Sequence, residues 1–337
     1  MVGDGIFQIR IFKYLIPNYC LMSKIITYVS HLSFSVLFTY IIIFKSLPFL
    51  KKIFPAKPTQ RGMHKIIKPS SGGISFILTY LILVVYQGFY LPLFSLPLGI
   101  LGMIDDKYNI SKFLRFVFQV FTILSIIFYI CKDESVFIGN LLSDNLLYLI
   151  PLIFFGAAVI NSINFMDGID GLVCGCMIII FIALNVKMHY LIPIIGTLLA
   201  FLKFNWFPSK VFMGDSGSLF LGSFLLSLIF LSKDIMEILK VLLLCSPLFL
   251  DAIFCIFRRL INKQNIFKSH KLHLYQRLVT AGLKHSTVSL IYISSTFLLS
   301  IVFIFSNFIL LFITAIMIFI TGIYLDKNYA KNFHSLI

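Results

Sequence analysis

Long apolar stretches separated by short polar loops recur along all 337 residues of the chain. The clearest stretches are about 20 residues long, the length that an α-helix needs to cross a bilayer. The pattern predicts about eleven transmembrane helices, with a break at Gly88 between the second and the third. Their expected ranges are 25–46, 72–88, 89–104, 114–131, 145–163, 171–186, 189–204, 217–232, 238–257, 286–305 and 307–325.

The composition supports a membrane protein, because 59% of the residues are hydrophobic and only 12% are charged. A soluble protein of this length needs more polar residues to cover its surface. The start of the chain does not combine a charged segment, a short apolar stretch and a small-residue cleavage site, so we expect no removable signal peptide. We therefore expect an all-α, polytopic integral membrane protein in which residues 1–337 form a single membrane-embedded domain.

The net charge of +15 comes from Lys and Arg residues that gather in alternate short loops. This placement is typical of the cytoplasmic loops of membrane proteins and does not indicate a nucleic-acid partner. It predicts an N-terminus outside and a C-terminus in the cytoplasm, although Arg10 and Lys13 near the start favour the opposite orientation. The basic loops cover positions 51–68, 107–115, 210, 258–284 and 327–331.

The polar clusters of the chain all fall on the loops that this orientation places in the cytoplasm. Independent solvated loops would not be expected to collect their acids and histidines on one face, so we expect these residues to form one site. The clusters contain Asp105 and Asp106; Asn161, Asn164, Asp167 and Asp170; Asn205, Lys210 and Asp215; and His270, His273, Gln276 and Arg277.

The chemistry of these clusters indicates a divalent cation and a phosphate ester. Several carboxylates on one surface repel one another unless a cation lies between them, and Mg²⁺ prefers carboxylates, water and phosphate oxygens. Basic side chains beside the acids are suited to bind phosphate. Those that we expect to contact substrate are Lys107, Arg115, Lys210 and Arg277, together with the two histidines.

Two other groups allow more than one interpretation. His270 and His273 could bind zinc, but the sequence offers no obvious third ligand. Asp251 lies within the ninth apolar run, where an acid is a functional candidate, although pairing with Arg258 or Arg259 also explains it. The six cysteines mostly lie in or beside apolar runs without metal-type spacing, so we interpret them as packing residues.

Six motifs together resemble the polyprenyl-phosphate N-acetylhexosamine-1-phosphate transferases. This family includes enzymes that initiate O-antigen and teichoic-acid synthesis, and the phospho-MurNAc-pentapeptide translocase. The resemblance covers about residues 69–282 and implies transfer of a sugar-1-phosphate from a UDP-sugar to undecaprenyl phosphate, with Mg²⁺ (or Mn²⁺ in its place) and release of UMP. The motifs are PSSGG, GMIDDKYNIS, NSINFMDGIDGL, FNWFPSKVFMGDSGSLFLG, PLFLDAIFCIFRR and SHKLHLYQRL.

The resemblance also implies roles for individual residues. Asp105 and Asp106 match paired aspartates that serve the metal or that position and deprotonate the lipid phosphate, and Asp215 matches a direct Mg²⁺ ligand. The segment with Asn161, Asn164, Asp167 and Asp170 matches a loop that contacts the nucleotide and the metal site. His270 and His273 match a loop that handles the nucleotide-sugar phosphates. We expect catalytic roles for Asp105, Asp106, Asp170 and His270, and substrate contacts from Asn205 as well.

The last loop carries His-Lys-Leu-His, whereas the translocase branch has three adjacent histidines. This resembles the O-antigen and capsule branch, whose donors are UDP-GlcNAc or UDP-N-acetyl-deoxyhexoses such as FucNAc and QuiNAc. The resemblance implies a bacterial inner-membrane enzyme with its active site on the cytoplasmic face, surrounded by membrane lipids, and allows a homodimer. The alternative interpretation is a transporter or lipid flippase that uses intramembrane acids.

Overall fold

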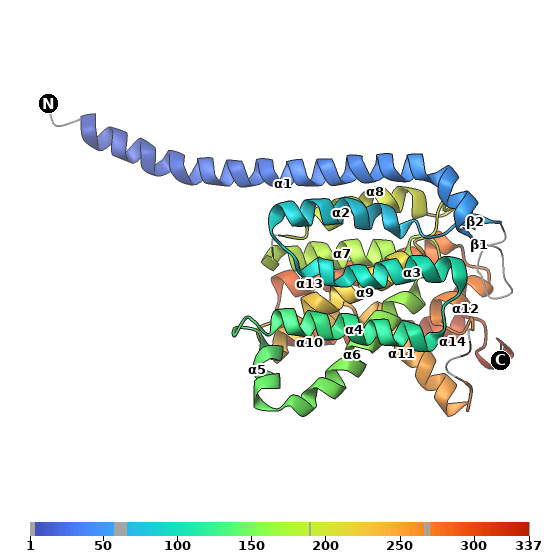
Figure 1. The fold of residues 1–337 in the computed structure, drawn as a ribbon. Coiled ribbons are helices and arrows are strands. Elements are labelled where there is room, and N and C mark those ends of the chain that lie inside the picture. Colours follow the sequence, from blue (N-terminus) through green and yellow to red (C-terminus); the bar gives the residue numbers. More distant parts are fainter. Residues whose placement is uncertain (1–3, 57–65, 189, 266–267, 269, 337) are drawn as a thin grey trace.

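The computed structural model describes residues 4–56, 66–188, 190–265, 268 and 270–336, and nearly all of its ordered elements are helices (Figure 1). Two short strands, β1 (Pro55–Ala56) and β2 (Lys68–Pro69), form an antiparallel pair. The α-helices are α1 (Asp4–Ile53), α2 (Gly73–Gln87), α3 (Leu96–Tyr108), α4 (Lys112–Ile130), α5 (Phe137–Asp144), α6 (Leu149–Met166), α7 (Leu172–Met188), α8 (Ile192–Asn205), α9 (Gly214–Phe230), α10 (Ile235–Leu244), α11 (Ser246–Ile261), α12 (Leu274–Thr280), α13 (His285–Phe305) and α14 (Phe308–Asn328). The 3₁₀ helices are η1 (Leu91–Ser95), η2 (Leu146–Tyr148) and η3 (His334–Leu336).

Five helical segments in the described part of the chain are long and apolar enough to cross a membrane. The bent pair α10 and α11 makes a sixth if it is taken as one span, and the apolar helices α2, α7, α8 and α9 are shorter. The protein is therefore an all-α polytopic membrane protein, as the sequence predicts. The five long segments are Lys24–Ile53, Lys112–Ile130, Leu146–Met166, His285–Phe305 and Phe308–Asn328.

Helices lie at each of the predicted spans, but two spans differ in form: the third divides into η1 and α3, and the ninth is bent. The break at Gly88 is confirmed, since Gly88 ends α2 in the left-handed conformation with φ of 70°. The predicted span 238–257 is not one continuous helix, because α10 ends at Leu244 and α11 continues at 81° to it. Pro247 lies in the first turn of α11, where its missing N–H is tolerated but where it cannot continue a preceding helix. Residue 189, the start of the seventh predicted span, lies outside the described residues.

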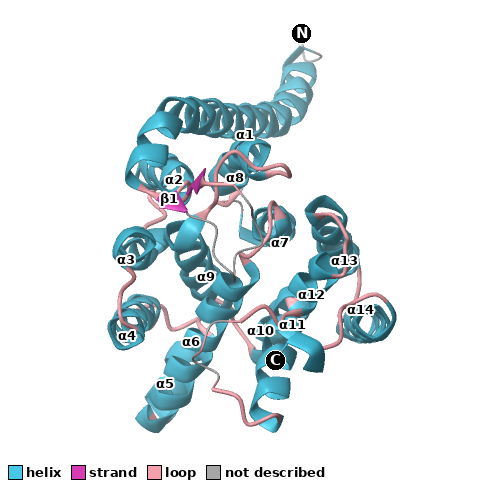
Figure 2. Cartoon of the chain, turned by 90° about the vertical axis from the view of Figure 1, so that its right-hand side faces the viewer, coloured by secondary structure: helices cyan, strands magenta, loops and turns pink. Residues whose placement is uncertain are grey.

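Helix α9 lies in the centre of the bundle, and all of its residues from Ser216 to Phe230 are buried (Figure 2). Its neighbours approach through glycines: a Cβ on Gly73 of α2 would overlap Gly217, and a Cβ on Gly102 of α3 would overlap the backbone carbonyl of Asp215. Such small residues allow helix backbones to pack closely in membranes. The ends of α3 and α9 are thereby held side by side.

The strands, α12 and the C-terminus lie at one end of the bundle, whereas α1 begins beyond the opposite end (Figure 1). The C-terminal ends of α3, α6 and α8 and the N-terminal end of α9 meet at the end that carries the strands, so their connecting loops are neighbours there. We call this the polar end of the bundle. Its assignment to the cytoplasm stays a prediction.

Candidate active site

The paired aspartates at the C-terminal end of α3 have different partners. Asp105 is buried, accepts a 2.7 Å hydrogen bond from the Ile110 amide through Oδ1, and accepts a hydrogen bond from Arg115 through Oδ2. Asp106 accepts from the hydroxyl groups of Ser70 at 3.1 Å and Ser71 at 2.6 Å. Asp105 therefore orients Arg115, while Asp106 lies against the segment that precedes α2.

Gly214 is what lets the start of α9 approach Asp106. The Asp215 amide donates a 3.1 Å hydrogen bond to Oδ1 of Asp106. Gly214 has φ of 73°, and an added Cβ would lie 2.6 Å from the Ser71 amide nitrogen and would overlap the Asp106 carboxylate. Only glycine fits this left-handed position and this narrow space. The glycine before Asp215 is thus part of the site.

Asp215 forms the middle of a network that joins three helices. Its Oδ1 accepts a 2.9 Å hydrogen bond from Nδ2 of Asn164 on α6, and its Oδ2 lies 3.0 Å from Arg115 on α4. Since Arg115 also contacts Asp105, one guanidinium bridges two carboxylates. Nδ2 of Asn164 also donates to Ser218 at 2.9 Å. The network fixes Asp105, Asp215 and Asn164 relative to one another.

Asp167 joins this group at the end of α6, and its side chain is half-buried. Burial and then the charges of Asp215, Asp106 and Asp170 raise the pKa of Asp167 well above its usual range. Among the described residues, none donates a hydrogen bond to its carboxylate. A carboxylate that lacks a partner and faces other carboxylates is suited to bind a cation.

The four carboxylates of Asp105, Asp106, Asp167 and Asp215 are here called the acid cluster, and their donor set fits a hard divalent ion. Carboxylate oxygens are the protein ligands that Mg²⁺ prefers, and it completes its shell with water and phosphate oxygens. Arg115 is the only basic side chain paired with the cluster in the part of the chain that the structure describes. One guanidinium cannot balance four acids, so a cation fits the charge as well as the ligands.

Asp170 is buried and ties three segments together. Lys68 Nζ is 3.5 Å from its Oδ2, the Ser209 amide donates to the same oxygen at 3.0 Å, and His285 Nδ1 is 3.8 Å from Oδ1. Burial alone would raise the pKa of Asp170, but His285, Ser209 and Lys68 together hold it below its usual range. This side chain is only 2% exposed, which suits positioning of the loop. The predicted catalytic role of Asp170 stays a prediction.

The two predicted histidines lie together beside α11. Their rings stack with centroids 5.1 Å apart, and Nδ1 of His273 is 3.6 Å from Oδ1 of Asp251. Burial opposes protonation of His273, but Asp251 outweighs it and raises the pKa of His273 to about 10. Burial, followed by the charge of His273, lowers the pKa of His270 to about 3. At neutral pH, His273 is therefore charged and His270 is neutral.

Tyr275 connects the histidine segment to the loop that carries Asp167. Its hydroxyl donates a 2.9 Å hydrogen bond to the Phe165 carbonyl, and a Cβ on Gly168 would overlap that hydroxyl. Asp251 holds the other side of the same segment, because it accepts hydrogen bonds from the Leu274 and Tyr275 amides. The histidines and the acid cluster thus belong to neighbouring parts of the polar end.

The remaining predicted contacts fall into buried and exposed groups. Asn161 exchanges amide hydrogen bonds with Gln119 on α4, and Asn205 accepts from the Gly171 amide and donates to the Val211 carbonyl. Lys107 and Lys210 are exposed, so their ammonium groups are accessible to a charged ligand.

Arg277 is buried, and its hydrogen bonds go to residues outside the acid cluster. It donates to Asp326 on α14 and to the backbone carbonyls of Leu272 and Lys331. The geometry therefore gives it a role in docking the C-terminal segment, and its predicted contact with substrate stays a prediction.

Sequence reasoning missed four polar side chains that the structure places in the networks around the acids. Ser70 and Ser71 stand in the PSSGG motif, so the two hydroxyls directly before a glycine pair were an available signal. Lys68 and His285 gave no local signal, because each reaches Asp170 from a distant part of the chain. Such partners become visible only when the loops are brought together.

Comparison with known proteins places this arrangement in a family. Residues 88–233 match the model of glycosyl transferase family 4. The chain is 30% identical over 271 residues to a probable undecaprenyl-phosphate N-acetylglucosaminyl 1-phosphate transferase of Bacillus subtilis, with 73% of this chain and 75% of that protein covered. The protein belongs to glycosyl transferase family 4. The resemblance inferred from the six motifs is confirmed.

The names of other relatives of this family 4 member indicate two kinds of transferred group. It is 32% identical over 238 residues to an undecaprenyl-phosphate alpha-N-acetylglucosaminyl 1-phosphate transferase of Thermotoga maritima, covering 68% of this chain and 76% of that one. It is 30% identical over 271 residues to a phospho-N-acetylmuramoyl-pentapeptide-transferase of Dictyoglomus thermophilum, covering 74% of this chain and 87% of that protein. These relatives are polyprenyl-phosphate sugar-1-phosphate transferases, so the reaction class is that of a phosphotransferase.

Proposed function

We propose that this protein transfers an N-acetylhexosamine-1-phosphate from a UDP-sugar to undecaprenyl phosphate and releases UMP. The observation that carries the proposal is the acid cluster, which is bridged by Arg115 and lies at the polar end of an apolar helical bundle. A lipid phosphate and a soluble nucleotide can meet only at such a boundary. We place the reaction at the cytoplasmic face of the bacterial inner membrane, where it would initiate O-antigen or other envelope polysaccharide synthesis.

Asp106, Asp167 and Asp215 are the residues that would hold Mg²⁺, with Mn²⁺ as a substitute. Asp105 is less suited to this, since its side chain is buried, whereas those of Asp106, Asp167 and Asp215 are only partly buried. The bound ion would neutralise charge on the phosphates, which is the main requirement of phosphoryl transfer. Asp105 instead fixes Arg115, so that the guanidinium stays beside Asp215.

The reaction itself needs few further groups from the chain. An oxygen of the lipid phosphate attacks the β-phosphorus of the donor, and the bond between that phosphorus and the oxygen that bridges it to the α-phosphorus breaks. UMP leaves with the bridging oxygen. Positioning and charge neutralisation account for most of the rate in such reactions, and we favour direct attack without a covalent enzyme intermediate. The exposed Lys107 and Lys210 supply positive charge for the incoming donor.

An apolar cavity gives the lipid chain a place beside α6. It has a volume of about 450 Å³ and lies among α6, α10, α11 and α14. The bend between α10 and α11 helps to form it, because the wall includes side chains from both helices. Its lining includes Phe155, Val159, Leu243, Phe249, Ile253 and Phe312. An isoprenoid chain is a suitable occupant, since it is apolar and reaches the cavity from the bilayer.

The histidine segment is the part of the site that we expect to select the donor. His270 stacks on His273 with ring centroids 5.1 Å apart and is only partly buried, so its ring can contact phosphate or nucleotide. The two separated histidines lead us to favour UDP-GlcNAc, or a UDP-N-acetyl-deoxyhexose such as UDP-FucNAc or UDP-QuiNAc, over the muramyl-pentapeptide donor.

The test is UMP release by the purified full-length protein with undecaprenyl phosphate and Mg²⁺. UDP-GlcNAc, UDP-GalNAc, UDP-QuiNAc, UDP-FucNAc and UDP-MurNAc-pentapeptide are offered one at a time. We expect release with one of the first four, dependent on the lipid and abolished by chelator. UMP release only with the pentapeptide donor would overturn the donor assignment. No UMP release with any of the five donors, from protein shown to be folded, would overturn the proposed reaction.

A further inference from the structure

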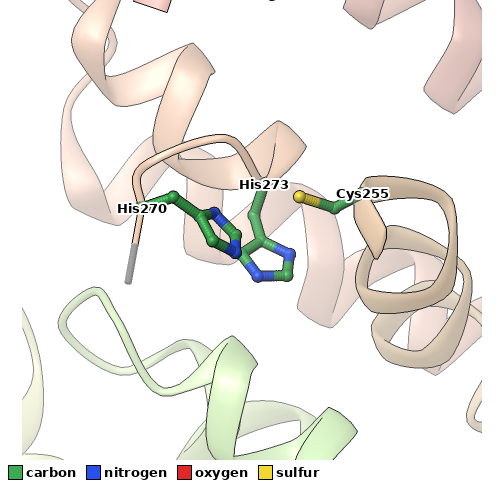
Figure 3. A group of neighbouring side chains, drawn as sticks. All are labelled: Cys255, His270 and His273. Atoms are coloured by element: carbon green, nitrogen blue, oxygen red, sulfur yellow. The ribbon is translucent and has the colours of Figure 1, made fainter. Parts of the chain in front are cut away.

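Three side chains that can bind a transition metal meet between α11 and the segment before α12. Cys255 lies on α11 and its thiol points toward His273, with His270 on the other side of that ring (Figure 3). One ligand atom from each of the three lies within 4.8 Å of the others. A cysteine on α11 is therefore the third candidate ligand, which the sequence did not reveal.

The donor types distinguish this group from the acid cluster. A thiolate and two imidazoles are ligands of Zn²⁺ and similar borderline ions, whereas Mg²⁺ prefers oxygen. Ligand atoms around one zinc ion lie roughly 3.5 Å apart, given bonds of about 2.0–2.3 Å. The three atoms are therefore close enough for small side-chain rotations to bring them onto one ion.

The surroundings of His273 already resemble those of a metal ligand. His273 is 3% exposed, and its Nδ1 has no hydrogen-bond partner among the residues that the structure describes. Asp251 lies 3.6 Å from this nitrogen and is held by the hydroxyl of Tyr292 at 2.6 Å. Carboxylates commonly accept the second N–H of a metal-bound imidazole, which leaves the other nitrogen for the metal.

Binding has two identifiable costs. Asp251 favours the protonated form of His273, and one proton must leave that ring before it can bind a metal. The other cost lies at His270. The Leu272 amide donates a 3.2 Å hydrogen bond to Nδ1 of His270. A metal on that nitrogen takes its lone pair, and a metal on Nε2 places the proton on Nδ1, so this bond is lost in either case. It is a long hydrogen bond to a neutral group, with a net value of about 0.5–1.5 kcal/mol, whereas structural zinc sites gain about 10 kcal/mol or more.

We propose that Cys255, His270 and His273 bind one Zn²⁺ ion, separately from the acid cluster. Three protein ligands leave a fourth position for water or another small ligand, as in zinc sites that are open on one side. The ion would join α11 to the segment before α12, and so would restrain the two histidines that we expect to face the donor. The binding itself does not depend on the proposed transfer reaction.

The experiment uses the full-length protein in detergent, stripped with chelator and titrated with Co²⁺ as a spectroscopic probe. We expect near-ultraviolet absorption from a thiolate bound to cobalt, lost when Zn²⁺ displaces it. Cys255→Ser should abolish this absorption and weaken zinc binding at least tenfold. The control, Cys131→Ser, removes an exposed thiol that follows α4, and it should leave the absorption and the zinc affinity unchanged. Thermal unfolding and gel filtration confirm that the variants are folded.

Two results would overturn the site: no cobalt–thiolate absorption in the wild type, or absorption that persists in Cys255→Ser. A second variant, His270→Gln, removes a different ligand and so tests the site independently of the cysteine. It should weaken zinc binding by about tenfold or more. Because no UDP-sugar or lipid is present, a failure here is distinct from a failure of the transfer assay.

Discussion

At the scale of single residues, Asp215 is the side chain whose loss should separate metal binding from folding. Asp215→Asn keeps the shape and the amide that donates to Asp106, but removes one charge from the acid cluster. We expect Mg²⁺-dependent UMP release to fall by about 10²–10³-fold, because charge neutralisation in the transition state weakens. We also expect Mg²⁺ to raise the unfolding temperature of the wild type and not that of the variant.

The matched control for Asp215→Asn is Asp133→Asn at the opposite end of the bundle. Asp133 is exposed and accepts hydrogen bonds from the amide and hydroxyl of Ser135. This variant should keep both the turnover and the response to Mg²⁺. Turnover above half of the wild-type value in Asp215→Asn would contradict its assignment as a metal ligand.

The residues also show how much of the site the sequence could predict. That the aspartates would gather was predictable, because each stands at the end of an apolar run on the same predicted face. The partners of Arg277 and Asn205 were not predictable. Arg277 binds Asp326 on α14, and Asn205 binds the backbone of Gly171 and Val211, so each role depends on how distant segments pack. The presence of a polar residue in a loop does not reveal whether its side chain will hydrogen-bond within the protein or stay available to a ligand.

At the scale of helices, the contact between α3 and α9 controls the geometry of the acid cluster. A Cβ on Gly102 would overlap the Asp215 carbonyl, so Gly102→Ala must push the two helix ends apart. We expect UMP release to fall more than tenfold, with a loss of about 1–3 kcal/mol in the free energy of unfolding from overpacking. Steady-state UMP release and denaturant unfolding measure the two effects.

Gly99→Ala, one turn earlier on α3, is the control. Its Cβ would lie 3.3 Å from Cδ1 of Ile77 and 3.5 Å from Phe220, which are side-chain atoms, and the Ile77 side chain can shift. This variant should lose less than half of the activity. Equal losses in the two variants would show that close packing of α3 in general, and not its register against Asp215, sets the activity.

The helices themselves were more predictable than their bends. Gly88 ended a helix as expected, since glycine adopts the left-handed conformation without strain. The bend between α10 and α11 was missed because the run around Cys245 stays apolar on both sides, and hydropathy does not register a change of direction. Pro247 was the local signal, and its position in a first turn permits a new helix axis.

At the scale of the whole molecule, the orientation in the membrane decides which substrates can reach the site. Cys131 ends α4 at the end of the bundle opposite Asp105 and is exposed, while Cys174, Cys176, Cys245 and Cys255 are buried. In a Cys20→Ser background, a membrane-impermeant maleimide should therefore label Cys131 in intact spheroplasts. This follows if the polar end, with its basic loops, faces the cytoplasm.

The complementary variant reports from the polar end. Lys284→Cys, made without Cys20 and Cys131, places a thiol at an exposed position between α12 and α13. It should react with the impermeant maleimide only after the membrane is permeabilised, because an inward-facing thiol is shielded by the bilayer. The reverse labelling pattern would place the acid cluster outside the cell, where UDP-sugars made in the cytoplasm do not reach it. The proposed reaction therefore requires that Cys131 and the residue at position 284 label from opposite sides.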